Sequence, residues 1–319
     1  MNLRQIHVGH YGAVMGLAGL GLTARAAAPL FPGVFRAPAY FTEAWVLLSV
    51  LALLILLVLY GMKLAKNRES VVEDFTNPGL LGFCGALPVG MSLVAGGLAP
   101  YVPGFAGGLW WVACLMLVAF QAWAISRWLG GQVELGKLNA GWLIVMVGGI
   151  VTPGPGIALG YGGASHVFFG FSACAAAVLV PLLFARAAIA PPLTEPLRAT
   201  WFILLVPPSL IYANGAALFH LEALEALYYA SLVLFVALAF YARGFLRWPF
   251  SPAWWAFTFP LDALAYAAAR FSQTHPGEEP WRAIAGLLLA LATIAVSGVL
   301  LRNLYSTLAT PRSASSRAA

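Results

Sequence analysis

Charged residues are scarce in this sequence. Only 9% of its 319 residues are Asp, Glu, Lys or Arg, whereas a soluble domain carries about 25%. The chain is 61% hydrophobic, and its mean hydropathy is +0.87. This composition excludes an ordinary soluble domain and indicates an integral membrane protein. The net charge of +6 then reports orientation in the membrane rather than nucleic-acid binding, which we do not expect.

Sequence motifs for catalysis and cofactor binding are also missing. The chain has no P-loop, no HExxH pair and no GxSxG elbow, which argues against an ATP-driven pump, a zinc protease and a serine hydrolase. The five histidines show no metal-ligand spacing. Cys84, Cys114 and Cys174 form no CxxC pair and are typical of apolar packing residues. We therefore expect no enzyme activity, no metal and no cofactor.

What the sequence does contain is ten apolar stretches of about the 20 residues that a membrane helix needs. They cover roughly residues 8–28, 40–65, 79–99, 104–128, 140–160, 165–187, 198–216, 222–243, 252–272 and 281–303. The first resembles a signal peptide, but its glycine row is unusual there, so we interpret it as a retained span. We predict one transmembrane domain over 1–309 and a disordered cytoplasmic tail over 310–319.

The positive charges predict the orientation of these spans. With the N-terminus inside, 13 of the 17 Lys and Arg residues fall on the cytoplasmic side. Only Arg25, Arg36, Arg270 and Arg282 fall on the outer side. Because cytoplasmic segments carry the excess of Lys and Arg, this bias favours an even number of spans with both termini in the cytoplasm.

The ten stretches alternate between two kinds. The odd ones contain glycine or proline, whereas the even ones are mostly aliphatic, although the sixth contains Gly170 and Pro181. The interruptions that we predict to kink pore-lining helices are Gly16, Pro88, Pro153, Pro207, Pro208 and Pro260. A helix broken at membrane depth needs partners other than lipid for its freed backbone groups. The fold prediction is therefore an all-α membrane protein of five helical hairpins, with five kinked inner helices around a central pore.

The ninth stretch carries a more specific pattern. The run WWAFTFP at 254–260 resembles the ninth span of the slow-type anion channel and TehA-like family, also called the tellurite-resistance/dicarboxylate transporter family. The run HYGAVMGLAGL at 10–20 resembles that family's first span, and the proline pair at 207–208 also fits. The resemblance implies five inner and five outer helices and a homotrimer with one pore per subunit. The absence of long termini suggests a minimal bacterial form in the inner membrane.

The resemblance also implies a gate and a class of permeant. Phe259, directly before Pro260, matches the family's pore-plugging phenylalanine. An aromatic ring across a narrow pore is an apolar constriction that water and ions cross poorly. Pro260 frees the carbonyl of Ala256, and Phe257 lies about 200° away around the helix, so both rings cannot face one pore. The alternative is that Phe259 is an ordinary packing residue. Family permeants are chloride, nitrate, sulfite, tellurite-like oxyanions or C4-dicarboxylates.

Asp262 is the acidic residue well inside a span, and two interpretations stay open. A carboxylate at the bilayer centre costs roughly 2.5–3.5 kcal/mol, so it must face protein or water. It could couple transport to protons, or it could be structural, paired with Arg25 or a hydroxyl such as Ser209. Because a fixed negative charge would oppose anion passage, we expect it behind the pore lining. Asn214, Ser92, Thr152 and Tyr212 could give the pore polar patches, or they could form hydrogen bonds within the packed helices.

The sequence thus leads to a main hypothesis and an alternative. The main one is gated passage of small anions through a central pore closed by Phe259. The alternative is a secondary, proton-coupled transporter or exporter of C4-dicarboxylates, sulfite or tellurite-like oxyanions. A membrane enzyme is a weak third, because no catalytic constellation is present.

Overall fold

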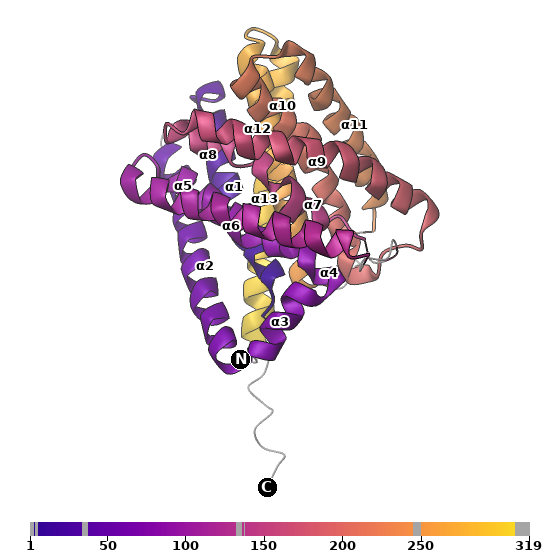
Figure 1. Ribbon diagram of the computed structural model, residues 1–319. Helices are drawn as coiled ribbons and strands as arrows, with labels where there is room; N and C mark the ends of the chain where they lie inside the picture. The colour runs from indigo at the N-terminus through magenta and orange to yellow at the C-terminus, as the bar shows by residue number, and fades with distance from the viewer. Residues whose placement is uncertain are drawn as a thin grey trace.

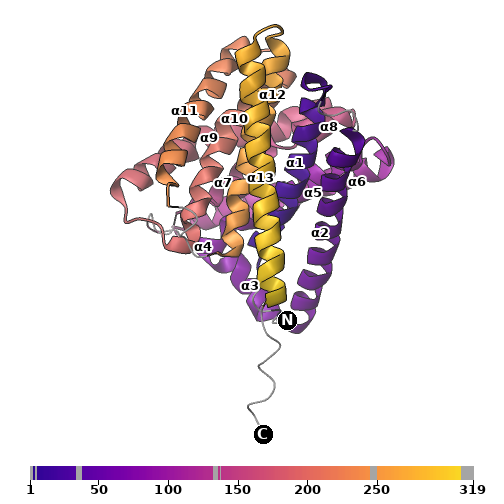
Figure 2. The same cartoon turned by 180° about the vertical axis from the view of Figure 1, so that it is seen from behind.

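The described residues are almost entirely helical, as predicted. The computed structural model describes residues 3, 6–33, 38–131, 136, 138–244 and 250–309, and no strand occurs among them (Figure 1). The start of this part of the chain and the end of its last helix lie at the same end of the molecule (Figures 1 and 2). The predicted tail over 310–319 lies outside the described residues.

Five long helices correspond to the even stretches of the sequence. They are α2 (Pro38–Lys66), α6 (Pro103–Leu129), α9 (Gly162–Ile189), α11 (Glu225–Tyr241) and α13 (Glu279–Ala309). In the membrane-length parts of these helices, only 17% to 33% of the residues are buried. Their exposed side chains include many Leu, Ile, Val and Phe residues, which suits contact with lipid acyl chains.

Five composite segments correspond to the odd stretches; four begin as a 3₁₀ helix and continue as an α-helix, and the one in the fifth stretch has a 3₁₀ helix between two short α-helices. They are η2 and α1 (Val8–Tyr11, Gly12–Ala27), η4 and α5 (Gly82–Gly85, Ala86–Leu98), α7, η6 and α8 (Trp142–Val147, Gly148–Ile150, Pro153–Ala158), η7 and α10 (Glu195–Leu205, Val206–Phe219), and η10 and α12 (Pro252–Trp254, Trp255–Thr274). Shorter elements are η3 (Ala28–Leu30), α3 (Arg68–Thr76), α4 (Pro78–Leu81) and η8 (Glu222–Leu224).

These composite segments are the buried part of the molecule. Burial reaches 61%, 83% and 67% in the first, third and seventh stretches, and 15 of the 20 residues of α12 are buried. They also contact one another in a closed order: α1 with α5, α5 with α8, α7 with η7, α10 with α12, and α12 with α1. Each is covered by the exposed helix that follows it, and Figure 2 shows α13 along the outside of this arrangement.

The number of membrane crossings stays a prediction. Eight described helical segments are long and apolar enough to cross a bilayer. The fifth stretch is shorter, at Trp142–Ala158. The ninth, α12, is not among the eight, and it carries Asp262 and Arg270 within its 20 residues. The fifth and ninth stretches are both enclosed by the other segments, and a shorter or more polar helix is tolerated in such a place.

Four of the five predicted prolines lie at or near a change of helix type in their buried segment. Pro153 is the first residue of α8, and Pro88, Pro207 and Pro208 lie in the first turns of α5 and α10. A first-turn proline breaks no α-helical hydrogen bond, because its amide would have no partner there. Pro260 lies inside α12 instead, so the carbonyl of Ala256 loses its i+4 donor.

Gly16 has a different role from the predicted kink. Helix α1 continues through it from Gly12 to Ala27. A Cβ atom at Gly16 would overlap the hydroxyl of Thr258 on α12, and one at Gly12 would lie 3.3 Å from the Cβ of Trp255. Gly16 therefore allows close approach of two helices rather than breaking one, which is the other use of small residues in membrane helices.

We predict that Gly16→Val lowers thermal stability. The added methyl groups would push α1 away from α12, and overpacking of this kind costs about 1–3 kcal/mol. The measurement is the unfolding temperature of the purified protein in detergent. Gly61→Val is the matched control, because Gly61 lies on exposed α2 with no other atoms near its Cβ position. Equal unfolding temperatures for both variants would contradict the assigned packing.

Candidate functional site

The five buried segments enclose two cavities. One, of about 180 Å³, includes His7 in its lining and is called here the His7 cavity. The other, of about 240 Å³, includes Asp262 and is called the Asp262 cavity. Each receives lining residues from all five buried segments, and α2, α6, α9, α11 and α13 contribute none. Among the described residues, the five buried segments therefore line the cavities, and the five long exposed helices cover them.

Phe259 lies at the junction of the two cavities. Its side chain is 5% exposed, and it lines both cavities, as does Val151. A Cβ atom at Gly19 would lie 2.8 Å from Cδ2 of the Phe259 ring. The ring therefore fits between the cavities because α1 presents no side chain at that point.

Phe257 faces elsewhere, as the helical geometry predicts. It is buried and lines neither cavity. Its ring packs against Phe202 of η7, with 5.9 Å between the ring centroids. The two phenylalanines of the same helix thus have separate environments, and only Phe259 contacts the cavities.

The His7 cavity is apolar and holds no fixed charge. Its lining is mostly aliphatic and aromatic and includes no Lys, Arg, Asp or Glu. Burial, followed by the nearby charges of His10 and Lys63, lowers the pKa of His7 to about 4. The His7 imidazole is therefore neutral at pH 7. An ion in this cavity would meet neither a strongly attractive nor a strongly repulsive charge.

The Asp262 cavity is more polar. Thr23, Arg25, Asn214, Asp262 and Tyr266 line it together with apolar residues. The guanidinium of Arg25 donates to the Glu43 carboxylate at 3.1 and 3.3 Å. It also donates to the carbonyls of Gly96 and Gly97, each at 3.2 Å. Arg25 is thus held at the cavity wall by bonds that occupy both of its terminal nitrogens.

Asp262 lies in the lining and not behind it, so the expected position was wrong. The side chain is fully buried, and neither carboxyl oxygen has a hydrogen-bond partner among the described residues. The predicted structural pairs are wrong too, because Arg25 bonds to Glu43 and the Ser209 hydroxyl has no partner there. Thr23 donates to the backbone carbonyl of Asp262 at 3.1 Å, leaving the carboxyl itself unengaged.

Comparison with known proteins identifies the family. The family model for voltage-dependent anion channels matches residues 5–304. The chain belongs to the voltage-dependent anion channel family. It is 23% identical to the S-type anion channel SLAH3 of Arabidopsis thaliana over 304 residues, which is 92% of this chain and 47% of that protein. It is 26% identical to the S-type anion channel SLAH2 of the same plant over 259 residues, 79% of this chain and 50% of that one.

This match confirms the resemblance drawn from the sequence. The chain is a membrane protein of a family of anion channels rather than enzymes. It spans about half the length of the curated relatives it matches. Of the run at 254–260 that carried the resemblance, Phe259 lines both cavities.

The other predicted pore residues of this family member divide into two groups. Pro207 and Pro260 line the His7 cavity. The remaining predicted kink residues, which line neither cavity, are Gly16, Pro88, Pro153 and Pro208. Of the predicted polar patches, Asn214 lines the Asp262 cavity and donates to the carbonyl of Ile150 at 2.7 Å. Ser92, Thr152 and Tyr212 line neither cavity. The described residues contain no cluster of three or more His, Cys, Asp or Glu that could hold a metal.

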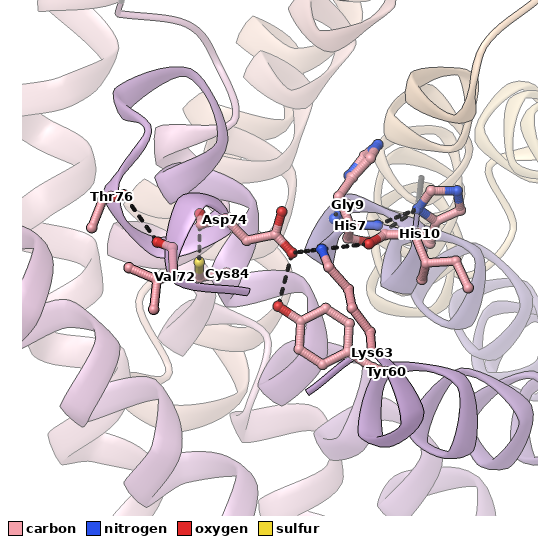
Figure 3. Close-up of polar contacts among 10 residues, drawn as sticks. His7, Gly9, His10, Tyr60, Lys63, Val72, Asp74, Thr76 and Cys84 are labelled. Carbon is pink, nitrogen blue, oxygen red and sulfur yellow. Dashed lines mark hydrogen bonds and ion pairs between the residues drawn. The ribbon is translucent and has the colours of Figure 1, made fainter. Parts of the chain in front are cut away.

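A buried ion pair supports the rim of the His7 cavity, and sequence reasoning missed it. Lys63 of α2 is fully buried, and its Nζ donates to Asp74 of α3 and to the carbonyl of Ile6, both at 2.7 Å (Figure 3). The hydroxyl of Tyr60 donates to the same Asp74 oxygen at 2.8 Å. The network thus attaches the residue before His7 to α2 and α3. Lys63 looked like one more cytoplasmic charge because its partner is 11 residues away in a separate helix.

We predict that Asp74→Ala destabilises the protein by about 3–5 kcal/mol, because it leaves the buried Lys63 ammonium unpaired. The readout is the unfolding temperature in detergent. The neighbouring exposed acid in Glu73→Ala is the control and is expected to change little. The double variant Lys63→Met/Asp74→Ala is expected to recover much of the loss, since both charges are then gone. If Asp74→Ala has the same unfolding temperature as the wild type, the pair does not hold α3 in place.

Proposed function

We propose that this protein passes small anions across the membrane through the two cavities, and that Phe259 closes the passage between them. The observation that carries the proposal is the place of Phe259, which lines both cavities while Phe257 lines neither. The proposed permeants are those of the family resemblance: chloride, nitrate, sulfite, other oxyanions or dicarboxylates. The proposed setting is a bacterial inner membrane, with both termini cytoplasmic and three subunits that each contain one pathway.

The chemistry of the two cavities suits transient rather than tight binding of an anion. A permeating ion must be able to leave each site as well as enter it. In the described part of the His7 cavity no fixed charge is present, and in the Asp262 cavity Glu43 offsets the charge of Arg25. Neither cavity resembles a deep electrostatic trap. A dry aromatic barrier between two such cavities would limit the flux of ions more than binding does.

A channel is favoured over the alternative of a secondary transporter, because both relatives carry the name of anion channel. The two mechanisms differ in a measurable way. A channel equilibrates an anion down its electrochemical gradient. A proton-coupled transporter would accumulate it against that gradient when a pH difference is imposed across liposomes.

We predict that Phe259→Ala raises anion flux by about tenfold or more, because removal of the ring joins the two cavities. The measurement is flux of chloride, nitrate, sulfite, malate and tellurite into proteoliposomes. Phe257→Ala is the matched control, since the same truncation on the same helix lies outside both cavities. The assignment fails if folded Phe259→Ala protein conducts no more than the wild type, or if Phe257→Ala gives the same increase.

A further inference from the structure

We infer that Asp262 decides whether an anion can occupy the Asp262 cavity: the protonated side chain admits the anion, and the ionised one excludes it. This inference rests on the proposed function, because it concerns the same pathway. It adds a second residue that controls the passage of anions, by its charge, whereas Phe259 would control it by blocking the space. The ligand is a small inorganic anion, for which chloride serves as the probe.

The first argument is the position of Asp262 beside the proposed gate. It follows Phe259 by three residues in α12, so both side chains lie on nearly the same face. A Cβ atom at Gly19 would lie 2.8 Å from the carboxyl Oδ2 and 2.8 Å from the Phe259 ring. The carboxyl and the ring therefore converge on one point of α1. An anion that passes the ring meets this carboxyl.

The second argument is that nothing in the described structure neutralises Asp262. The carboxyl is fully buried without a hydrogen-bond partner. From α1, the charged group facing the same cavity is Arg25, which already bonds to Glu43 at 3.1 Å. An ionised Asp262 therefore leaves the Arg25, Glu43 and Asp262 group with one net negative charge. A protonated Asp262 leaves it neutral.

The remaining neighbours do not alter this balance. From α10 and α12 the cavity receives Asn214 and Tyr266, which are uncharged. The lining residues from α5 and α8 are Leu93, Gly96, Gly154, Pro155 and Ala158, none of which titrates. The segments η7, α11 and α13 also pack against α12 but give this cavity no residue. The charge of the cavity is thus set by one proton on Asp262.

The physical consequence differs between the two protonation states. A buried carboxylate without a partner repels an approaching anion strongly, because little water screens the two charges. When a proton from the cavity water binds to the carboxylate, the repulsion disappears and the new O–H can donate a hydrogen bond to the anion. Passage then depends on pH without any need for uphill transport.

The test uses the opened pathway, so that the gate does not limit flux. Chloride flux through Phe259→Ala protein is measured in liposomes at equal pH on both sides, from about pH 8 to about pH 5. We expect the flux to rise as the pH falls, by up to about tenfold per pH unit while Asp262 is mostly ionised. Phe259→Ala/Asp262→Asn is expected to give a high flux with little pH dependence, because its amide cannot ionise. Phe259→Ala/Asp262→Glu is expected to restore the pH dependence.

A matched control removes a different carboxyl. Phe259→Ala/Glu73→Gln changes an exposed acid on α3 and is expected to keep the pH dependence of Phe259→Ala. The inference is overturned if Phe259→Ala flux is high but insensitive to pH. It is also overturned if adding Asp262→Asn leaves the pH dependence unchanged, since another group would then carry it. Failure of Phe259→Ala to raise flux at any pH would instead reject the proposed function, and this inference with it.

Discussion

The close contact between α1 and α12 is the constraint on which the rest of the structure depends. Three glycines of α1 at positions 12, 16 and 19 face α12; side chains at positions 16 and 19 would collide with it, and one at position 12 would be in tight contact. Membrane helices lack a hydrophobic force that separates them from lipid, so close packing of this kind provides much of their association. Because the backbones approach so closely, Phe259 and Asp262 are placed with little freedom beside the cavities.

The two cavities divide the pathway into chemically different halves. The His7 cavity is apolar and uncharged at pH 7. The Asp262 cavity contains a fixed ion pair and an unpaired carboxyl. In the proposed mechanism, the ring of Phe259 sets a steric and dewetting barrier, whereas Asp262 sets an electrostatic one. Each barrier can be removed separately, the first by Phe259→Ala and the second by Asp262→Asn, so substitutions on one helix distinguish the two.

The covering helices contribute in another way. They supply no cavity lining, but one of them, α2, holds the chain next to His7 together with α3, through Lys63 and Asp74. A buried ion pair is expensive to desolvate and adds little net stability, yet loss of either partner is costly. Such a pair favours one arrangement of the segments that it joins. Here the joined segments are α2, α3 and the residues just before the first buried segment.

The sequence by itself determined the class of protein and the alternation of buried and exposed segments, because composition and the spacing of Gly and Pro are local properties of the chain. The residue proposed as the gate came from the resemblance of the short run that ends in Phe259 and Pro260 to a known family. Tertiary structure alone decided the roles of Gly16, Asp262, Lys63 and Arg25. Each depends on an atom far away in sequence: the hydroxyl of Thr258, the open cavity wall, the carboxylate of Asp74 and that of Glu43. A periodic pattern shows which face of a helix is buried, but only packed helices show which buried polar group has found a partner.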